Sequence, residues 1–163
     1  MASFANTLRA VNELKGIGII SDYAVAGAMA IVFWIEPVPT FDLDVLVLLP
    51  QSTGPLVSLE PIYQWAADRN YAAEQEHVVI EGVPVQFLPS FGALADEAIH
   101  TAVDRQYQEV DIRVVRPEYL IALYLVPSAR TTKRRERAAM LRDSPSIDHD
   151  RLDDLMTRFN LTF

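Results

Sequence analysis

The sequence has no cysteine and only three histidines, at positions 77, 100 and 149. Without cysteine the chain can form neither a disulfide scaffold nor a thiolate zinc site. The histidines have no ligand-like spacing, so we expect each to lie at the surface and not in a metal site. No apolar run approaches the roughly 20 residues that a membrane-spanning helix needs, and the first 16 residues lack the apolar core of a signal peptide. These absences favour a cytoplasmic protein without membrane contact.

Basic residues are also scarce, with 14 Lys and Arg against 22 Asp and Glu, a net charge of −8 and a pI near 4.8. A broad nucleic-acid-coating surface is therefore excluded, because phosphate neutralisation needs a basic face. Five of the basic residues nevertheless fall between Arg130 and Arg137, which leaves room for a local basic patch. Half of the 163 residues are apolar, a composition typical of one globular domain.

Hydrophobic periodicity predicts an alternation of helices and strands. We expect helices at 3–15, 27–35, 58–69, 93–105, 117–126 and 131–141, with a last helix that carries Leu152 and Leu155. We expect strands at 23–27, 40–49, 109–115 and, joined at Glu81-Gly82, within 74–89. This order indicates an α/β (α+β) fold with a mixed central sheet flanked by helices. We expect a single domain over 1–163, with a sheet core at 1–115 and C-terminal helices at 116–163.

The segment "TFDLDVLVLL" begins with two acids, Asp42 and Asp44. Alternate strand residues share a face, so these carboxylates lie about 7 Å apart along the chain and repel each other unless a cation joins them. A divalent cation such as Mg²⁺ takes hard oxygen ligands from one or two carboxylates, water and substrate phosphates. The alternative is that both acids face solvent or cap a turn.

The small-residue turn "VAGA" (Val25 to Ala28), a helix and then "TFDLDV" together resemble the nucleotidyltransferase superfamily, which shares the catalytic core of DNA polymerase beta. The likeness is to the small bacterial nucleotidyltransferase-like proteins, which include the abortive-infection toxin group. Thr40, "VQFLP" (Val85 to Pro89) and "RTTK" (Arg130 to Lys133) match further segments of that group. The resemblance spans about Tyr23 to Leu141.

This resemblance implies a nucleoside triphosphate substrate, Mg²⁺ or Mn²⁺ as cofactor, and transfer of a nucleoside monophosphate to a hydroxyl group. Asp42 and Asp44 are then metal ligands and catalytic residues. The remaining positions implied to contact the nucleotide are Ala26, Gly27, Ala28, Thr40, Arg130 and Lys133. We expect Arg134, Arg135 and Arg137 to form a solvated face, and Tyr124 to belong to the core.

The sequence departs from the family pattern in three places. Ala28 follows Gly27 where a second glycine or serine is usual, and Val38 stands where many relatives have arginine. Gln86 occupies the position of the third carboxylate, which often activates the attacking hydroxyl, and an amide cannot act as a general base. Glu81 and Asp111 are alternative third acids.

Three functions therefore remain open. The first is an enzyme that modifies RNA, protein or a small molecule. The second is a catalytically impaired nucleotide-binding or regulatory module of the same fold, of the toxin-antitoxin type, with a partner protein or as a homo-oligomer. The third is a structural domain in which the pair of acids is coincidental.

Overall fold

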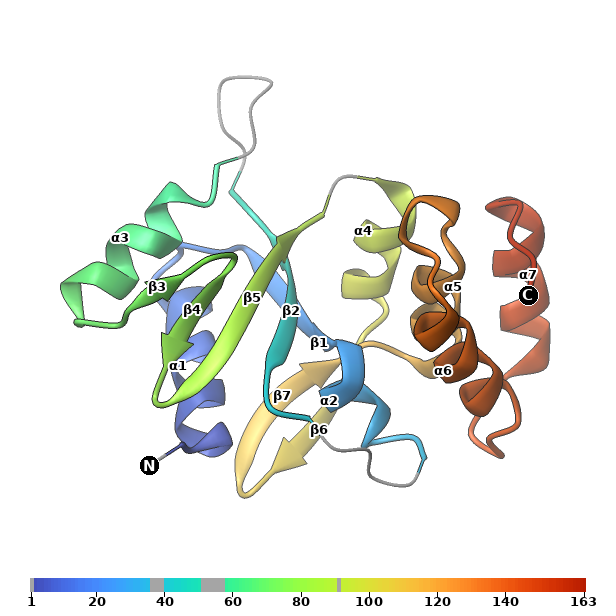
Figure 1. The fold of residues 1–163 in the computed structure, drawn as a ribbon, viewed down its shortest axis with the longest axis horizontal. Helices are drawn as coiled ribbons and strands as arrows, with labels where there is room; N and C mark the ends of the chain where they lie inside the picture. Colours follow the sequence, from blue (N-terminus) through green and yellow to red (C-terminus); the bar gives the residue numbers. More distant parts are fainter. Residues whose placement is uncertain (1, 36–39, 51–57, 91) are drawn as a thin grey trace.

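A computed structural model describes residues 2–35, 40–50, 58–90 and 92–163, and Figure 1 shows a twisted sheet with helices packed around it. The sheet has the strand order β3-β4-β5-β2-β1-β7-β6. Its strands are β1 (Asp22–Ala26), β2 (Leu43–Leu48), β3 (Ala73–Glu74), β4 (His77–Ile80), β5 (Val83–Pro89), β6 (Val103–Tyr107) and β7 (Val110–Val114). The mixed α/β architecture expected from the sequence is confirmed.

The described helices cover the sheet and continue into a C-terminal group (Figure 1). They are α1 (Phe4–Gly16), α2 (Gly27–Ile31), α3 (Glu60–Asp68), α4 (Ala93–His100), α5 (Pro117–Leu125), α6 (Thr132–Arg142) and α7 (His149–Arg158), with a 3-10 turn at Pro127–Ala129. Helix α4 packs on β1 and β2, and α5 packs on α4, α6 and α7. None of these helices is long and apolar enough to cross a membrane, within the part of the chain that the structure describes.

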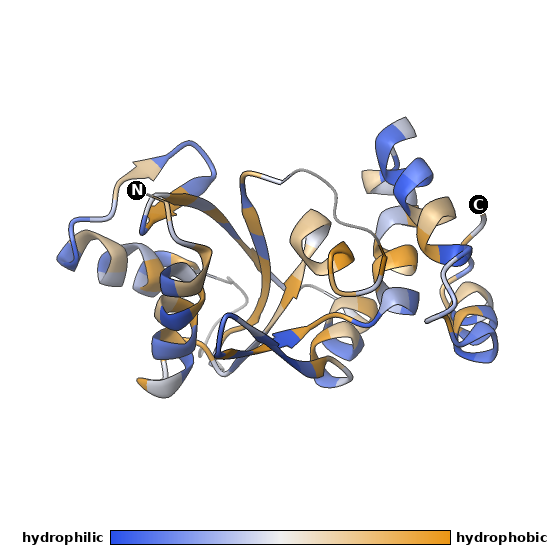
Figure 2. Cartoon of the chain, turned by 90° about the horizontal axis from the view of Figure 1, so that it is seen from below, coloured by the Kyte–Doolittle hydropathy of each residue, from blue (hydrophilic) through white to orange (hydrophobic). Residues whose placement is uncertain are grey.

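Strand β2 lies in the middle of the sheet because it is almost wholly apolar after Asp44, as a strand covered on both faces must be. It pairs antiparallel with β1 and parallel with β5. This register sets Asp44 opposite Ala26 on one side and opposite Gln86 on the other. Figure 2 shows hydrophobic residues concentrated on the central strands and on the helix faces toward them, with hydrophilic residues on the outer helix surfaces.

The junction expected at Glu81-Gly82 is confirmed. Glu81 and Gly82 join β4 to β5 with positive φ angles of 51° and 81°, the conformation of a tight hairpin turn. Asp148 caps α7 by accepting a hydrogen bond from the backbone N–H of Arg151. Val38 lies outside the described residues.

Two helices are shorter than the sequence pattern indicates. The helix expected over 93–105 ends at His100, and Val103–Tyr107 forms β6, an edge strand antiparallel to β7. The turn between these strands is made by Gln108 and Glu109, both at positive φ. Because neither residue is glycine, asparagine or aspartate, the usual hairpin signal is missing. Helix α2 stops at Ile31 instead of 35, and β3 is a short additional strand.

Asp22 ties β1 to α1 and β7. Its carboxylate accepts hydrogen bonds from Lys15 Nζ at 3.0 Å, from the backbone N–H of Tyr23 and from Arg113. Burial opposes ionisation of Asp22, but these hydrogen bonds outweigh it and lower the pKa of the carboxyl group. A carboxylate with a lowered pKa stabilises the fold above its unfolded-state pKa, and this contribution is lost as the pH falls through the folded-state value.

We therefore expect Asp22→Asn to lower the free energy of unfolding by about 1 kcal/mol at pH 7. The difference from the unmutated protein should shrink as the pH falls below the usual aspartate range and vanish below the folded-state pKa. Urea unfolding at a series of pH values measures this. Asp104→Asn is the control, since that side chain is 92% exposed and its contact with Arg113 is long, at 3.9 Å. An equal loss in both variants would contradict the assignment.

Candidate active site

Asp44 lies against the backbone of Gly27, where β1 passes into α2. Gly27 has a φ of +61°, and a Cβ atom built on it would stand 2.3 Å from Asp44 Oδ2. Both the positive φ and the absence of a side chain are therefore required at this position. The flanking residues Ala26 and Ala28 are buried, and the sheet register sets Ala26 beside Asp44. The structure thus brings together the small-residue turn and the second acid.

Asp42 stands just before β2 and is about half exposed. The Thr40 hydroxyl donates to the Asp42 carbonyl oxygen at 3.0 Å and lies 3.4 Å from Asp42 Oδ1. Thr40 therefore orients this acid through the loop that precedes the strand. On the other side, His77 Nε2 on β4 lies 3.9 Å from Asp42 Oδ2. Sequence reasoning did not connect this histidine with the acid pair.

The groups around Asp44 shift its pKa in opposite directions. Burial and the nearby Asp42 carboxylate raise the pKa of Asp44, whereas Arg134, His77 and Arg137 lower it. The net shift is upward, so the ionised form of Asp44 is disfavoured in the protein alone. A cation placed between two such carboxylates would relieve both the desolvation and the repulsion.

Gln86 is the β5 neighbour of Asp44. Because Asp44 and Gln86 are paired in parallel register, their side chains share a face of the sheet. The position of the third carboxylate is thus filled by an amide in the structure as well as in the sequence pattern. Gln86 can offer an oxygen ligand or a hydrogen bond, but it cannot take up a proton.

The acid pair fits a hard divalent cation. Its donors are carboxylate oxygens, one of them with a raised pKa, and the Gln86 amide is adjacent. Among the described residues there is no cluster of three or more His, Cys, Asp or Glu side chains suited to a metal ion. Two carboxylates suit Mg²⁺ or Mn²⁺, which keep several ligand positions for water and substrate phosphates.

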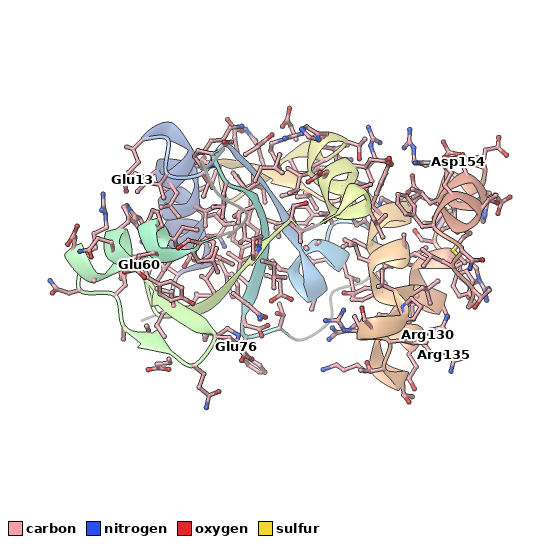
Figure 3. The ribbon with its side chains drawn as sticks, turned by 90° about the horizontal axis from the view of Figure 1, so that it is seen from above. Glu13, Glu60, Glu76, Arg130, Arg135 and Asp154 are labelled. Carbon is pink, nitrogen blue, oxygen red and sulfur yellow. The ribbon has the colours of Figure 1, made fainter. Side chains whose placement is uncertain are left out.

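Two of the expected basic residues lie elsewhere. Arg130 donates hydrogen bonds to the carbonyl oxygen and hydroxyl of Thr162, so C-terminal residues hold its guanidinium group. Lys133 is exposed in the first turn of α6. Figure 3 shows Arg130 and Arg135 at the α6 end of the molecule, with Glu13 and Glu60 at the other end. Arg134 and Arg137 on the same helix lower the pKa of Asp44. Arg134 and Arg135 are exposed, as expected of a solvated face, and Arg137 is half-buried.

The alternative third acids are also engaged away from Asp44. Glu81 accepts a hydrogen bond from the Tyr71 hydroxyl at 2.8 Å in the β4–β5 turn. Asp111 accepts one from Gln106 on β6, and β1 separates its strand from β2. The structure brings neither acid to the pair.

A pocket of about 260 Å³ opens beside Asp44 and Gly27. Its walls come from the sheet, α4, α5 and the start of α6, and they are mostly apolar. Tyr124 on α5 lines it and is buried, as expected of a core residue, yet its hydroxyl group forms no hydrogen bond of normal geometry to the described residues, with the Arg137 guanidinium close by. The Arg134 guanidinium lies 5.8 Å from the centre of the Tyr124 ring.

His77, Arg134, Arg137 and Tyr124 are therefore site residues that sequence reasoning missed. The helical spacing of Arg134 and Arg137 was visible, but it does not tell which face of α6 meets the sheet. The position of His77 follows from the pairing of β4 with β5. Val78 pairs with Val85, so His77 lies near Gln86 and the acid pair. That register can be known only once β4 and β5 are paired.

No protein-family model matches this chain, and no curated protein sequence matches it. Among solved structures, the solution structure of the antibiotic-resistance factor ANT(2'')-Ia is 16% identical with a TM-score of 0.54, covering 98% of this chain and 93% of that one. The crystal structure of ANT(2'')-Ia in complex with adenylyl-2''-tobramycin is 14% identical with a TM-score of 0.52, covering 96% of each chain. A nucleotidyltransferase-like protein from Paracoccidioides brasiliensis is 12% identical with a TM-score of 0.49, covering 97% of this chain and 88% of that one. These likenesses show that the chain shares the fold of ANT(2'')-Ia, and at the level of the fold they agree with the expectation from the sequence.

Proposed function

We propose that this protein is a nucleotidyltransferase that uses Mg²⁺ or Mn²⁺ to transfer a nucleoside monophosphate from a nucleoside triphosphate to a hydroxyl acceptor. The observation that carries the proposal is the Asp44 carboxylate held against the backbone of Gly27, with Asp42 close enough to raise its pKa. Two neighbouring carboxylates, one of them held against a glycine backbone, suit a metal-bound triphosphate.

In the proposed reaction the acceptor oxygen bonds to the α-phosphorus, and the bond from that phosphorus to the bridging oxygen breaks. Pyrophosphate leaves, and the hydroxyl proton passes to water, because Gln86 is not basic. The divalent ion, when bound, would neutralise part of the phosphate charge. Asp42 and Asp44 would hold it, Thr40 orients Asp42, and the missing side chain of Gly27 leaves room for the Asp44 carboxylate.

Arg134 and Arg137 supply the positive charge that the resemblance assigns to Lys133. Their guanidinium groups favour the ionised form of Asp44 in the protein alone, and the same field would stabilise negative charge on phosphate oxygens. The acids come from residues 1–115 and the arginines from residues 116–163. We therefore propose that the two parts act as one functional domain.

A catalytically impaired nucleotide-binding or regulatory module is the second candidate, and Gln86 is the observation that favours it. In this candidate the site keeps the two acids for the metal ion and lacks the general base. This predicts affinity for a metal-bound nucleotide with little turnover. RNA or a protein remain alternative acceptors, and a partner protein or a second copy remains an alternative to a monomer. Transfer to a hydroxyl has a parallel in the ANT(2'')-Ia complex with adenylyl-2''-tobramycin.

We expect Asp44→Asn to weaken metal-dependent nucleotide binding by at least about 100-fold, because it removes a charged ligand. In metal-free buffer at pH 7 the same variant should be more stable to heat, since burial and Asp42 disfavour the charged carboxylate. Calorimetric titration with each triphosphate, with and without Mg²⁺, and thermal unfolding measure both effects. Exposed Asp153→Asn is the control. Unchanged metal-dependent affinity in Asp44→Asn would overturn the proposed function.

We expect Gln86→Asp to raise the rate of pyrophosphate release at saturating nucleotide and acceptor by about 100-fold, since a positioned general base contributes this order of magnitude. Pyrophosphate release is followed over candidate acceptors with Mg²⁺ or Mn²⁺. Gln106→Asp, on the edge strand β6, controls for added negative charge. A rate in Gln86→Asp no higher than in the unmutated protein would show that the missing carboxylate does not limit turnover.

A further inference from the structure

The pocket beside Asp44 continues along the sheet on the face that carries the site. Leu46 and Leu88 line it, and they are paired with each other two positions beyond the pair of Asp44 and Gln86. The pocket is closed by Leu120, Leu123 and Tyr124 of α5. The apolar walls begin next to Asp44, so a hydroxyl compound bound in this pocket would lie beside the carboxylate that the proposed function assigns to the metal-bound nucleotide.

Tyr124 is the buried polar group of this pocket. Tyr124 is 5% exposed, and its hydroxyl forms no hydrogen bond of normal geometry to the described residues, although the Arg137 guanidinium lies close to it. Burial raises the pKa of Tyr124, and Tyr124 lines the same pocket as Asp44. A buried hydroxyl without a partner is costly. A ligand that hydrogen-bonds to it would remove that cost.

The charges of the pocket disfavour a polycation. Asp44 is the one acid among its lining residues in the described parts of the chain, and the proposed function uses Asp44 for the metal. The other charged lining residue is Arg134, and Arg137 lies nearby. An ammonium group that entered would lose its water and meet apolar carbons and arginine, which costs free energy without compensation.

We propose that this pocket is the acceptor subsite and that it takes a neutral or anionic hydroxyl compound with an apolar body, hydrogen-bonded to the Tyr124 hydroxyl. This inference rests on the proposed function, because only nucleotidyl transfer makes the ligand an acceptor. It distinguishes this chain from ANT(2'')-Ia, whose crystal structure holds an adenylylated tobramycin, since tobramycin carries several amino groups.

Three probes test the proposal on the full chain: 2-naphthol, 6-hydroxynaphthalene-2-sulfonate and tobramycin. Naphthol fluorescence and calorimetry should show binding of the two naphthols at least about tenfold tighter than binding of tobramycin. Binding should persist with Mg²⁺ and saturating nucleotide, because an acceptor sits alongside the nucleotide. Displacement of the naphthols by nucleotide would assign the pocket to the nucleobase, and equal or tighter tobramycin binding would refute the charge argument. Either result overturns the inference.

Tyr124→Phe separates a ligand-binding hydroxyl from a structural one. We expect it to weaken naphthol binding by about three- to tenfold, the effect of one hydrogen bond, without lowering the melting temperature. Tyr119→Phe is the matched control on the same helix, equally buried, with its hydroxyl donating to Glu97 at 3.1 Å. It should lower the melting temperature slightly and leave naphthol affinity unchanged. The reverse pattern would overturn the role of Tyr124.

Leu123→Glu and Leu123→Gln test the pocket charge with nearly equal shapes. The glutamate variant should bind 6-hydroxynaphthalene-2-sulfonate about tenfold more weakly than the glutamine variant and should gain affinity for tobramycin. No difference between the two variants would overturn the proposal. Asp42→Asn keeps the two hypotheses apart, because Asp42 is not among the residues that line the pocket: affinity for the uncharged 2-naphthol should change less than about twofold there, while metal-dependent nucleotide affinity is lost. If the naphthols bind as expected but nucleotide never does, the proposed function fails and the pocket specificity stands.

Discussion

The contact between the Asp44 carboxylate and the Gly27 backbone is the constraint on which the rest of the site depends. A side chain at residue 27 would occupy the place of Asp44 Oδ2. The residue that follows β1 and begins α2 must therefore have a positive φ and no Cβ atom. That close approach desolvates the acid, exposes it to its like-charged neighbour, and makes a bound cation favourable there.

The candidate site contains positively charged side chains although the chain as a whole is negatively charged. The protein carries a net charge of −8, yet α6 brings Arg134 and Arg137 to the carboxylate pair. Only the local arrangement matters for a bound triphosphate, because exposed charges beyond about 10 Å are screened at ordinary ionic strength. A positive helix next to two acids can hold an anionic ligand and its metal ion together without making the protein basic.

The C-terminal helices complete the site. The sheet contributes the acids, the glycine turn and Gln86, whereas α5 and α6 contribute the apolar wall, the buried Tyr124 hydroxyl and the arginines. Helix α5 can do this because it is buried almost all round. In the proposed function, a site shared by two segments distant in sequence would couple metal binding by the acids to the selection of the second ligand.

Local features determined much of this protein from its sequence alone: the two acids on one strand face, the glycine turn before them, the hairpin at Glu81-Gly82, and the family resemblance built on these motifs. They were predictable because each depends on residues close together in the chain. Tertiary structure alone decided that Arg134 and Arg137, rather than Arg130 and Lys133, act on Asp44. It also placed His77 beside Asp42 and turned 103–107 into a strand. Periodicity tells which residues share a face, but only packing against another element decides what that face meets.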